Sequence, residues 1–89
     1  MRPAWLSAIA SNSVRTVNLL PADERLDSDP LPPVITAMRG LAPGEVLRIR
    51  HKWEPQPFYD LWRRMGGFTW WAEQRGPDEW WIWVRRLPT

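Results

Sequence analysis

The chain has 89 residues, 44% of them hydrophobic, with a formal net charge of +2, eight tryptophans and no cysteine. A chain of this length has room for one domain with one two-layer core, which excludes a cleft between two domains. The lack of cysteine excludes disulfides, thiolate metal sites, thiol nucleophiles and persulfide carriers. The hydrophobic fraction and the 25% of charged residues indicate a globular protein, neither disordered nor membrane-spanning.

The positive excess lies in the second half of the chain, where eight basic residues after residue 43 face six acidic ones. An excess of two is too small to establish nucleic-acid binding by itself. Residues 1–13 are expected to form a flexible N-terminal tail, because their apolar run from Ala4 to Ala10 is too short for a signal peptide. We therefore expect a cytoplasmic protein without membrane association.

The first three elements follow from hydrophobic periodicity. Val14–Leu20 is rich in apolar and β-branched residues and ends at Pro21, which predicts a strand. An i, i+3, i+4, i+7 pattern then predicts an amphipathic helix, carried by Leu31, Val34, Ile35, Met38 and Leu41. Glu45–His51 alternates apolar residues with arginines and predicts a strand with one buried and one basic face.

The remaining elements are a short helix and a hairpin. Helical spacing relates Phe58, Leu61, Trp62 and Met65, and Gly66-Gly67 ends this second helix. Two aromatic-rich strands are then predicted, Phe68–Glu73 and Glu79–Arg86, joined by a turn over Gln74–Asp78.

The order βαβαββ predicts a two-layer α/β sandwich over residues 14–87, with a four-stranded mixed sheet and both helices on one face. No predicted element remains to cover the other face of the sheet. The side chains on that face therefore become candidates for binding.

Two acid-Pro-x-Pro repeats precede the helices, Asp29-Pro30-Leu31-Pro32 and Glu54-Pro55-Gln56-Pro57. Proline suits a first helical turn, where its missing N–H has no partner, although Pro33 shifts the expected start of the first helix towards itself. Each acid would then lie at a helix N-terminus and accept backbone N–H groups.

The same residues support a metal-binding alternative. Two parallel strands that feed two helices bring the two acids to one edge of the sheet, together with His51 at the end of the second strand. Asp29, His51 and Glu54 could there ligate a divalent metal ion. Capping is the more common role of such carboxylates, and one histidine is a sparse ligand set.

At these residues the sequence resembles the family called domain of unknown function 2249, a relative of the TusA/SirA sulfur-carrier fold. The resemblance covers about residues 14–87 and rests on Asp29-Pro30-Leu31, Val34-Ile35-x-Ala37-Met38-x-x-Leu41-Ala42-Pro43-Gly44-Glu45, Glu54-Pro55-x-Pro57-Phe58-Tyr59, Gly67-Phe68 and Trp80. In the sulfur carriers the first helix opens with Cys-Pro-x-Pro, whereas Asp29 stands at the cysteine position here. The resemblance therefore implies the fold without the persulfide activity.

Members of the resembling family also occur beside or fused to hemerythrin-like and other metal or nitrogen-oxide-related domains. The resemblance thus implies a role in metal, sulfur or redox metabolism. Its motif residues here are Pro30, Pro32, Pro55, Pro57 and Tyr59.

Strand alternation divides the aromatic residues between the two faces of the sheet. The inward set is expected to be Leu47, Ile49, Phe68, Trp70, Trp80, Ile82 and Val84, packed against the apolar residues of both helices. The outward set is then Arg48, Arg50, Trp71, Trp81, Trp83 and Arg85, a patch of the size that proteins usually hide or use.

Three interpretations of this Trp/Arg face compete. It forms a homodimer or binds a protein partner, because Trp and Arg dominate interface energetics. It binds single-stranded RNA, with bases stacked on Trp and phosphates on Arg48 and Arg50. Alternatively, arginine stems, the N-terminal tail or the tryptophans themselves cover the rings, and the face has no binding role.

The chain also lacks a Gly-rich phosphate loop and a nucleophile elbow, and His51 with Glu54 would form a base without a nucleophile or oxyanion hole. We therefore expect a non-enzymatic accessory or interaction module that binds through the Trp/Arg face. The alternatives are a small metal-binding protein that uses Asp29, His51 and Glu54, or an RNA-binding sheet domain.

Overall fold

The computed structural model describes residues 2–9, 11–20 and 31–88. In chain order the elements are α1 (Ala4–Ser7), η1 (Ser11–Ser13), β1 (Val14–Asn18), α3 (Leu31–Arg39), β2 (Val46–His51), α4 (Gln56–Met65), β3 (Phe68–Gly76) and β4 (Glu79–Arg86). The four strands form one sheet in the order β1-β2-β4-β3. β1 is parallel to β2, and the other two pairings are antiparallel.

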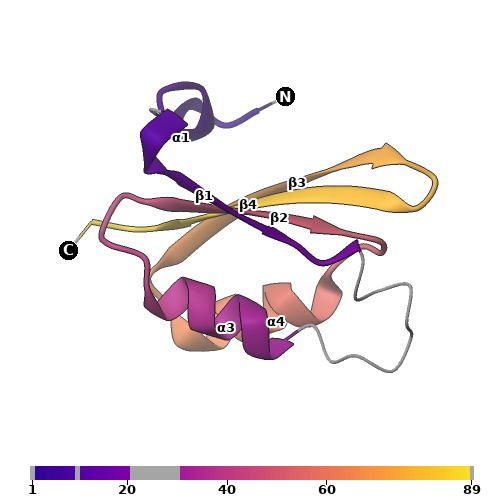
Figure 1. Ribbon diagram of the computed structural model, residues 1–89. Helices are drawn as coiled ribbons and strands as arrows, with labels where there is room; N and C mark the ends of the chain where they lie inside the picture. Colours follow the sequence, from indigo (N-terminus) through magenta and orange to yellow (C-terminus); the bar gives the residue numbers. More distant parts are fainter. Residues whose placement is uncertain (1, 10, 21–30, 89) are drawn as a thin grey trace.

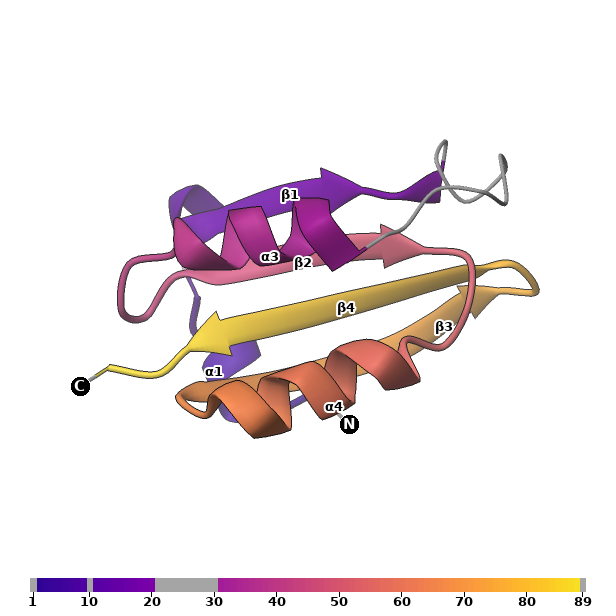
Figure 2. The ribbon, with the colours of Figure 1, turned by 90° about the horizontal axis from the view of Figure 1, so that it is seen from below.

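The two long helices lie together on one face of this sheet, with α3 beneath β1 and β2 and α4 beneath β3 (Figures 1 and 2). The predicted α/β class, the βαβαββ order and the placement of both helices are therefore confirmed. No helix in the described ranges is long and apolar enough to cross a bilayer.

The core lies between the helices and the inward face of the sheet, as the alternation predicts. Leu47, Ile49, Ile82 and Val84 are fully buried there, and Phe68, Trp70 and Trp80 pack against them. Apolar burial of this kind contributes about 25 cal/mol for each Å² removed from water, which makes this layer the main source of stability.

The buried face of α4 differs from the prediction. Trp62 and Phe58 are its buried residues, whereas Met65 is 43% exposed. The indole N–H of Trp62 donates a hydrogen bond to the sulfur of Met38 on α3. The expectation that Met65 belongs to the core is wrong, and Trp62, whose ring packs against Trp70, fills the core from this part of α4 instead.

Element boundaries differ from the predictions for local reasons. β1 ends at Asn18, two residues early, because the Asn18 side-chain oxygen accepts the N–H of Leu20. The second helix of the sandwich ends where predicted, at Met65, and the N–H of Gly66 bonds to the Trp62 carbonyl. β3 extends to Gly76, because a register shift between Gln74 and Gly76 lets the hairpin close over Pro77-Asp78.

The opposite face of the sheet is not free of secondary structure, contrary to the expectation from the predicted elements. α1 lies on this face, on the side away from α3 and α4 (Figure 1). Its Leu6 is buried in a second apolar cluster with Val46 and Trp83, and Trp5 and Ile9 pack around it. The outward face therefore has a covered part and an open part.

Candidate functional site

The outward face consists of rows of side chains that cross the sheet. One row joins Arg48 on β2, Trp83 on β4 and Trp71 on β3, because these residues are register partners. The next row joins Arg50, Trp81 and Glu73 in the same way. Arg85 lies opposite Val46 and Thr69 in a third row. The structure thus brings all six predicted residues of the Trp/Arg face onto one surface.

The N-terminal segment covers the part of this face that contains Trp71 and Trp83. Trp83 is only 6% exposed and packs against Leu6. The guanidinium of Arg2 lies 5.2 Å from the ring centroid of Trp83 and 5.6 Å from that of Trp71. Arg2 is also paired with Glu73 at 3.3 Å. The expected exposure of Trp83 is therefore wrong. For this ring the alternative of a cover by the N-terminal segment and an arginine is confirmed, since apolar and cationic groups of residues 2–9 lie against it.

The open part of the face is centred on Trp81. Three guanidinium groups surround its ring, at centroid distances of 4.8 Å for Arg48, 5.2 Å for Arg50 and 4.6 Å for Arg75. Together with Glu79 these residues form what we call the Trp81 cluster. Arg75 is absent from the predicted set, because the sequence places it in the turn of the hairpin and its outward direction depends on the irregular register next to it.

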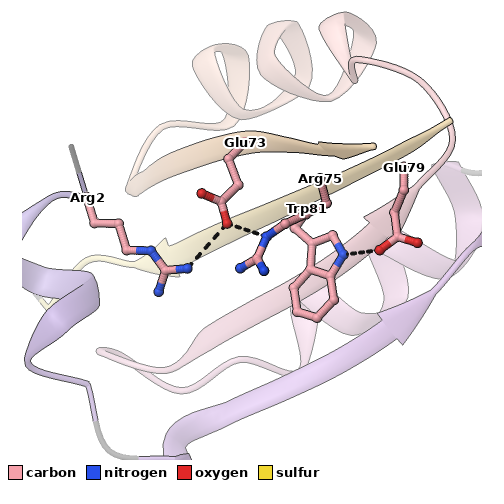
Figure 3. A network of polar contacts seen from close by, with 5 residues as sticks. All are labelled: Arg2, Glu73, Arg75, Glu79 and Trp81. Carbon is pink, nitrogen blue, oxygen red and sulfur yellow. Dashed lines mark hydrogen bonds and ion pairs between the residues drawn. The ribbon is translucent and has the colours of Figure 1, made fainter. Parts of the chain in front are cut away.

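Two carboxylates hold this arrangement together (Figure 3). Glu79 accepts the indole N–H of Trp81 and a 3.4 Å hydrogen bond from Arg50. The hydrogen bond from Trp81, followed by the charge of Arg50, holds the pKa of Glu79 below its usual range. Glu73 pairs with both Arg2 and Arg75 and so links the open part to the covered part.

The charge of the chain is concentrated on this face. The outward residues of the four strands and Arg2 contribute five arginines (Arg2, Arg48, Arg50, Arg75 and Arg85) and two glutamates (Glu73 and Glu79). This is an excess of three positive charges, whereas the whole chain carries +2. The outward face therefore accounts for the entire positive excess and favours an anionic partner.

The predicted metal ligands are only partly placed by the structure. His51 is 6% exposed, and its ring lies 5.5 Å from that of Trp53 and 5.4 Å from that of Phe58. Glu54 is exposed in the loop that follows, and Asp29 and Pro30 lie outside the described residues. Within residues 2–9, 11–20 and 31–88, no three His, Asp or Glu side chains gather as a metal site would require.

The second acid-Pro-x-Pro repeat opens α4 as predicted, but its acid does not cap the helix. Pro55 is the N-cap residue and is buried, and Pro57 is in the first turn. The Glu54 carboxylate accepts a hydrogen bond from the Gln56 side chain instead. The expected cap fails because Pro57 has no N–H and the Phe58 N–H bonds to the Pro55 carbonyl.

Pro32 of the first repeat and the adjacent Pro33 also fall within a first turn. α3 begins at Leu31 and not near Pro33 as expected, so Pro32 and Pro33 are its second and third residues. Both positions lack an intrahelical N–H partner in any helix, and two prolines are therefore tolerated there.

Tyr59, the last motif residue, lies on α4 and stacks on Trp70 with 6.1 Å between ring centroids. Burial raises the pKa of its phenol above the ordinary 10.0, and the charge of Glu54 adds to this shift. The unfolded chain therefore releases this proton more readily than the folded one, so stability should fall as the pH rises above about 10.

This pH dependence is testable because the chain contains one tyrosine. Phenolate absorbance at 295 nm should titrate with a midpoint above 10.0 in the folded protein and near 10.0 in urea. Tyr59→Phe should reduce the loss of stability between pH 9 and pH 11. A folded midpoint at or below the urea value would contradict the burial of this phenol.

Comparison with known proteins places the chain in one family. No curated protein and no solved structure matches it significantly. The family match spans residues 20–86 and so includes Arg48, Arg50, Arg75 and Trp81 but not Arg2 or Leu6. Since this match covers most of the chain, the protein belongs to the family described as "Uncharacterized conserved protein (DUF2249)".

Proposed function

We propose that this chain is a non-enzymatic interaction module that binds an acidic segment of a protein partner through the Trp81 cluster. The observation that carries the proposal is the convergence of three guanidinium groups within 5.2 Å of one indole ring. Among the described residues, two carboxylates pair with these guanidinium groups: Glu79 with Arg50 and Glu73 with Arg75. The three guanidinium groups around Trp81 thus outnumber the carboxylates that pair with them.

The chemistry of these groups favours carboxylates as ligands. A guanidinium is a planar fork that matches a carboxylate with two parallel hydrogen bonds. Arg48 uses one amino group on the hydroxyl of Thr16, Arg50 uses one on Glu79, and Arg75 pairs through Nε with Glu73. Arg and Trp are also the residue types enriched at the centres of protein interfaces.

The packing of the arginines disfavours the RNA alternative. A base must stack on an exposed aromatic face, and such stacking provides much of the affinity for single strands. Guanidinium groups lie against Trp81 and Arg2 lies against Trp71 and Trp83. A base would have to displace these cations before it could stack.

The family resemblance supports a wider context for this role. The βαβαββ order agrees with a TusA/SirA-like fold, and Asp29 at the position of the carrier cysteine leaves that fold without its persulfide chemistry. We accordingly propose a cytoplasmic accessory protein of metal, sulfur or redox metabolism, which docks on a partner instead of carrying sulfur.

The test is fluorescence anisotropy with three labelled probes of equal length: an octamer of glutamate, an octamer of glutamine and single-stranded octauridylate. We expect the glutamate peptide to bind with a micromolar dissociation constant that weakens with salt, and the glutamine peptide to bind at least tenfold more weakly. Equal binding of both peptides, or tighter binding of the RNA, would refute the proposal.

Matched variants localise the binding. Arg48→Gln combined with Arg75→Gln should weaken glutamate-peptide binding at least tenfold, because two of the three guanidinium forks are lost. Arg63→Gln combined with Arg64→Gln removes the same charge from exposed positions on α4, on the other side of the sheet, and should change binding by less than twofold. Similar losses in both double variants would show that only net charge matters.

A further inference from the structure

The sheet has two edge strands, β1 and β3. The proposed function does not involve the backbone groups along the outer edge of β3. β3 has nine residues and is the longest strand in the described parts of the chain. It ends the order β1-β2-β4-β3, and its pairing partner is β4 alone. Its other side thus presents backbone groups that no described strand binds.

The hydrogen-bonding direction of each β3 residue follows from the neighbouring ladder. Arg86 exchanges backbone hydrogen bonds with Gly44 and Glu45, so it faces the β2 side, while Leu87 donates to Gly67 on the β3 side. Successive residues of a strand point their N–H and C=O groups to alternate sides. Since Thr69 pairs with Arg85, Thr69, Trp71 and Glu73 face β4. The free edge therefore presents the backbone groups of Phe68, Trp70, Ala72 and Gln74.

The first five residues of β3 carry none of the charges, prolines or irregularities by which proteins usually block edge pairing. The run Phe68–Ala72 contains no charged residue, proline or glycine, and the irregularity in β3 comes only after Gln74. The other edge strand, β1, has five residues and carries Arg15. The free edge of β3 is therefore the better template for adding a strand.

We propose that a second copy of this chain adds to the free edge of β3 in antiparallel orientation and makes one continuous eight-stranded sheet. With the two-fold axis at Trp71, Phe68 pairs with Gln74 and Trp70 pairs with Ala72, so all four free residues are used. An axis at Ala72 would leave Phe68 without a partner. We assign the edge to a second copy because this register pairs the large Trp70 with the small Ala72 and brings no two like charges opposite each other.

The side chains agree with this register. Trp71 meets its own equivalent at the axis as a non-hydrogen-bonded pair, in which side chains approach most closely. Glu73 faces the neutral Thr69 of the second copy, so no like charges oppose each other within the ladder. The dimer uses none of the backbone groups of the Trp81 cluster. Dimerisation and acidic-peptide binding can therefore be tested independently, and failure of one does not contradict the other.

The affinity should be modest, because pairing along one short edge buries less surface than a permanent interface does. We expect a dissociation constant of about 1–100 μM, which sedimentation equilibrium from about 2 to 500 μM covers. The wild-type chain should change from monomer to dimer over this range. A monomer at the highest concentration would overturn the proposal.

Two substitutions at Thr69 separate dimerisation from folding. In T69E the new carboxylate of each copy lies opposite Glu73 of the other copy, so two pairs of like charges face each other. This repulsion should raise the dimer dissociation constant about tenfold. Within its own chain the same carboxylate faces Arg85, so folding stability should be unchanged or higher. T69K has the opposite effects, with unchanged or tighter dimers and a less stable fold. Parallel changes in stability and dimerisation would overturn the proposal.

The register can be measured directly, because the chain has no cysteine and Gln74→Cys would supply the only site for a spin label. With the axis at Trp71, the two labelled backbones lie six residues apart along the shared ladder, about 20 Å. A dimer with a clearly different label separation, or one that T69E leaves intact, would assign dimerisation to another surface. Dimers formed by face-to-face contact of the Trp/Arg surfaces would be identified in this way.

Discussion

Trp62→Ala is expected to lower the free energy of unfolding by about 3–5 kcal/mol, the usual cost of truncating a large buried aromatic residue. Trp62 is fully buried, and its ring lies 5.5 Å from that of Trp70 and 6.0 Å from that of Phe58. Its indole N–H also bonds to the sulfur of Met38, so the substitution disconnects α4 from α3 and from β3 together. Since small domains have only about 5–15 kcal/mol of stability, a large fraction would be lost.

Urea unfolding followed by circular dichroism measures this loss, with Trp53→Ala as the matched control. Trp53 is the same residue type but is 46% exposed, so its truncation should cost less than about 1 kcal/mol. Met65→Ala gives a second comparison, since Met65 belongs to the predicted core of the same helix and is exposed in the structure. A greater loss for Met65→Ala than for Trp62→Ala would mean that α4 packs in the orientation that the sequence pattern indicated.

This contrast shows how far periodicity determines the fold. Apolar spacing placed every main strand and both long helices, because strands and helices bury their residues at different periods. It did not decide which part of the α4 stripe is buried, because Phe58, Leu61, Trp62 and Met65 all fit one helical face. The choice depends on contacts with Trp70 and Met38, which are distant in the sequence.

The candidate site was predictable to a similar extent. Strand alternation identified the shared face of Arg48, Arg50, Trp81 and Trp83, since it requires only the period of two. It could not identify the cover over Trp83, because a helix of four residues leaves no periodic pattern. The sequence did not predict Arg75 as part of the site. The direction of its side chain depends on an irregular strand register, and the turn residues around it do not indicate such an irregularity.

The cover over Trp83 leads to the second large effect. Leu6→Asp is expected to detach α1 from the sheet and to cost about 1.5–3 kcal/mol, the value of burying a leucine side chain. Leu6 is 7% exposed between Val46 and Trp83, where a carboxylate would lose its hydration without a compensating partner. Because α1 has only four residues and is not one of the βαβαββ elements, it can leave the sheet while the remaining domain stays folded.

The indole ¹H–¹⁵N signals of the eight tryptophans report this change directly. Leu6→Asp should shift the signals of Trp83 and Trp71, which the N-terminal segment covers, and leave that of Trp62 in place. Ser7→Asp adds the same charge at an exposed position of α1 and should shift neither. Equal spectra for both variants would show that Leu6 does not hold α1 on the sheet.

The same variant separates the two parts of the Trp/Arg face. If the Trp81 cluster binds acidic segments by itself, Leu6→Asp should change the affinity for the glutamate peptide by less than about threefold, because Arg48, Arg50 and Arg75 remain in place. A tenfold loss would instead make Arg2 and the covered part contributors to the binding surface. A tenfold gain would identify α1 as a competitor that the partner must displace, since a cover that occupies part of the site lowers the apparent affinity.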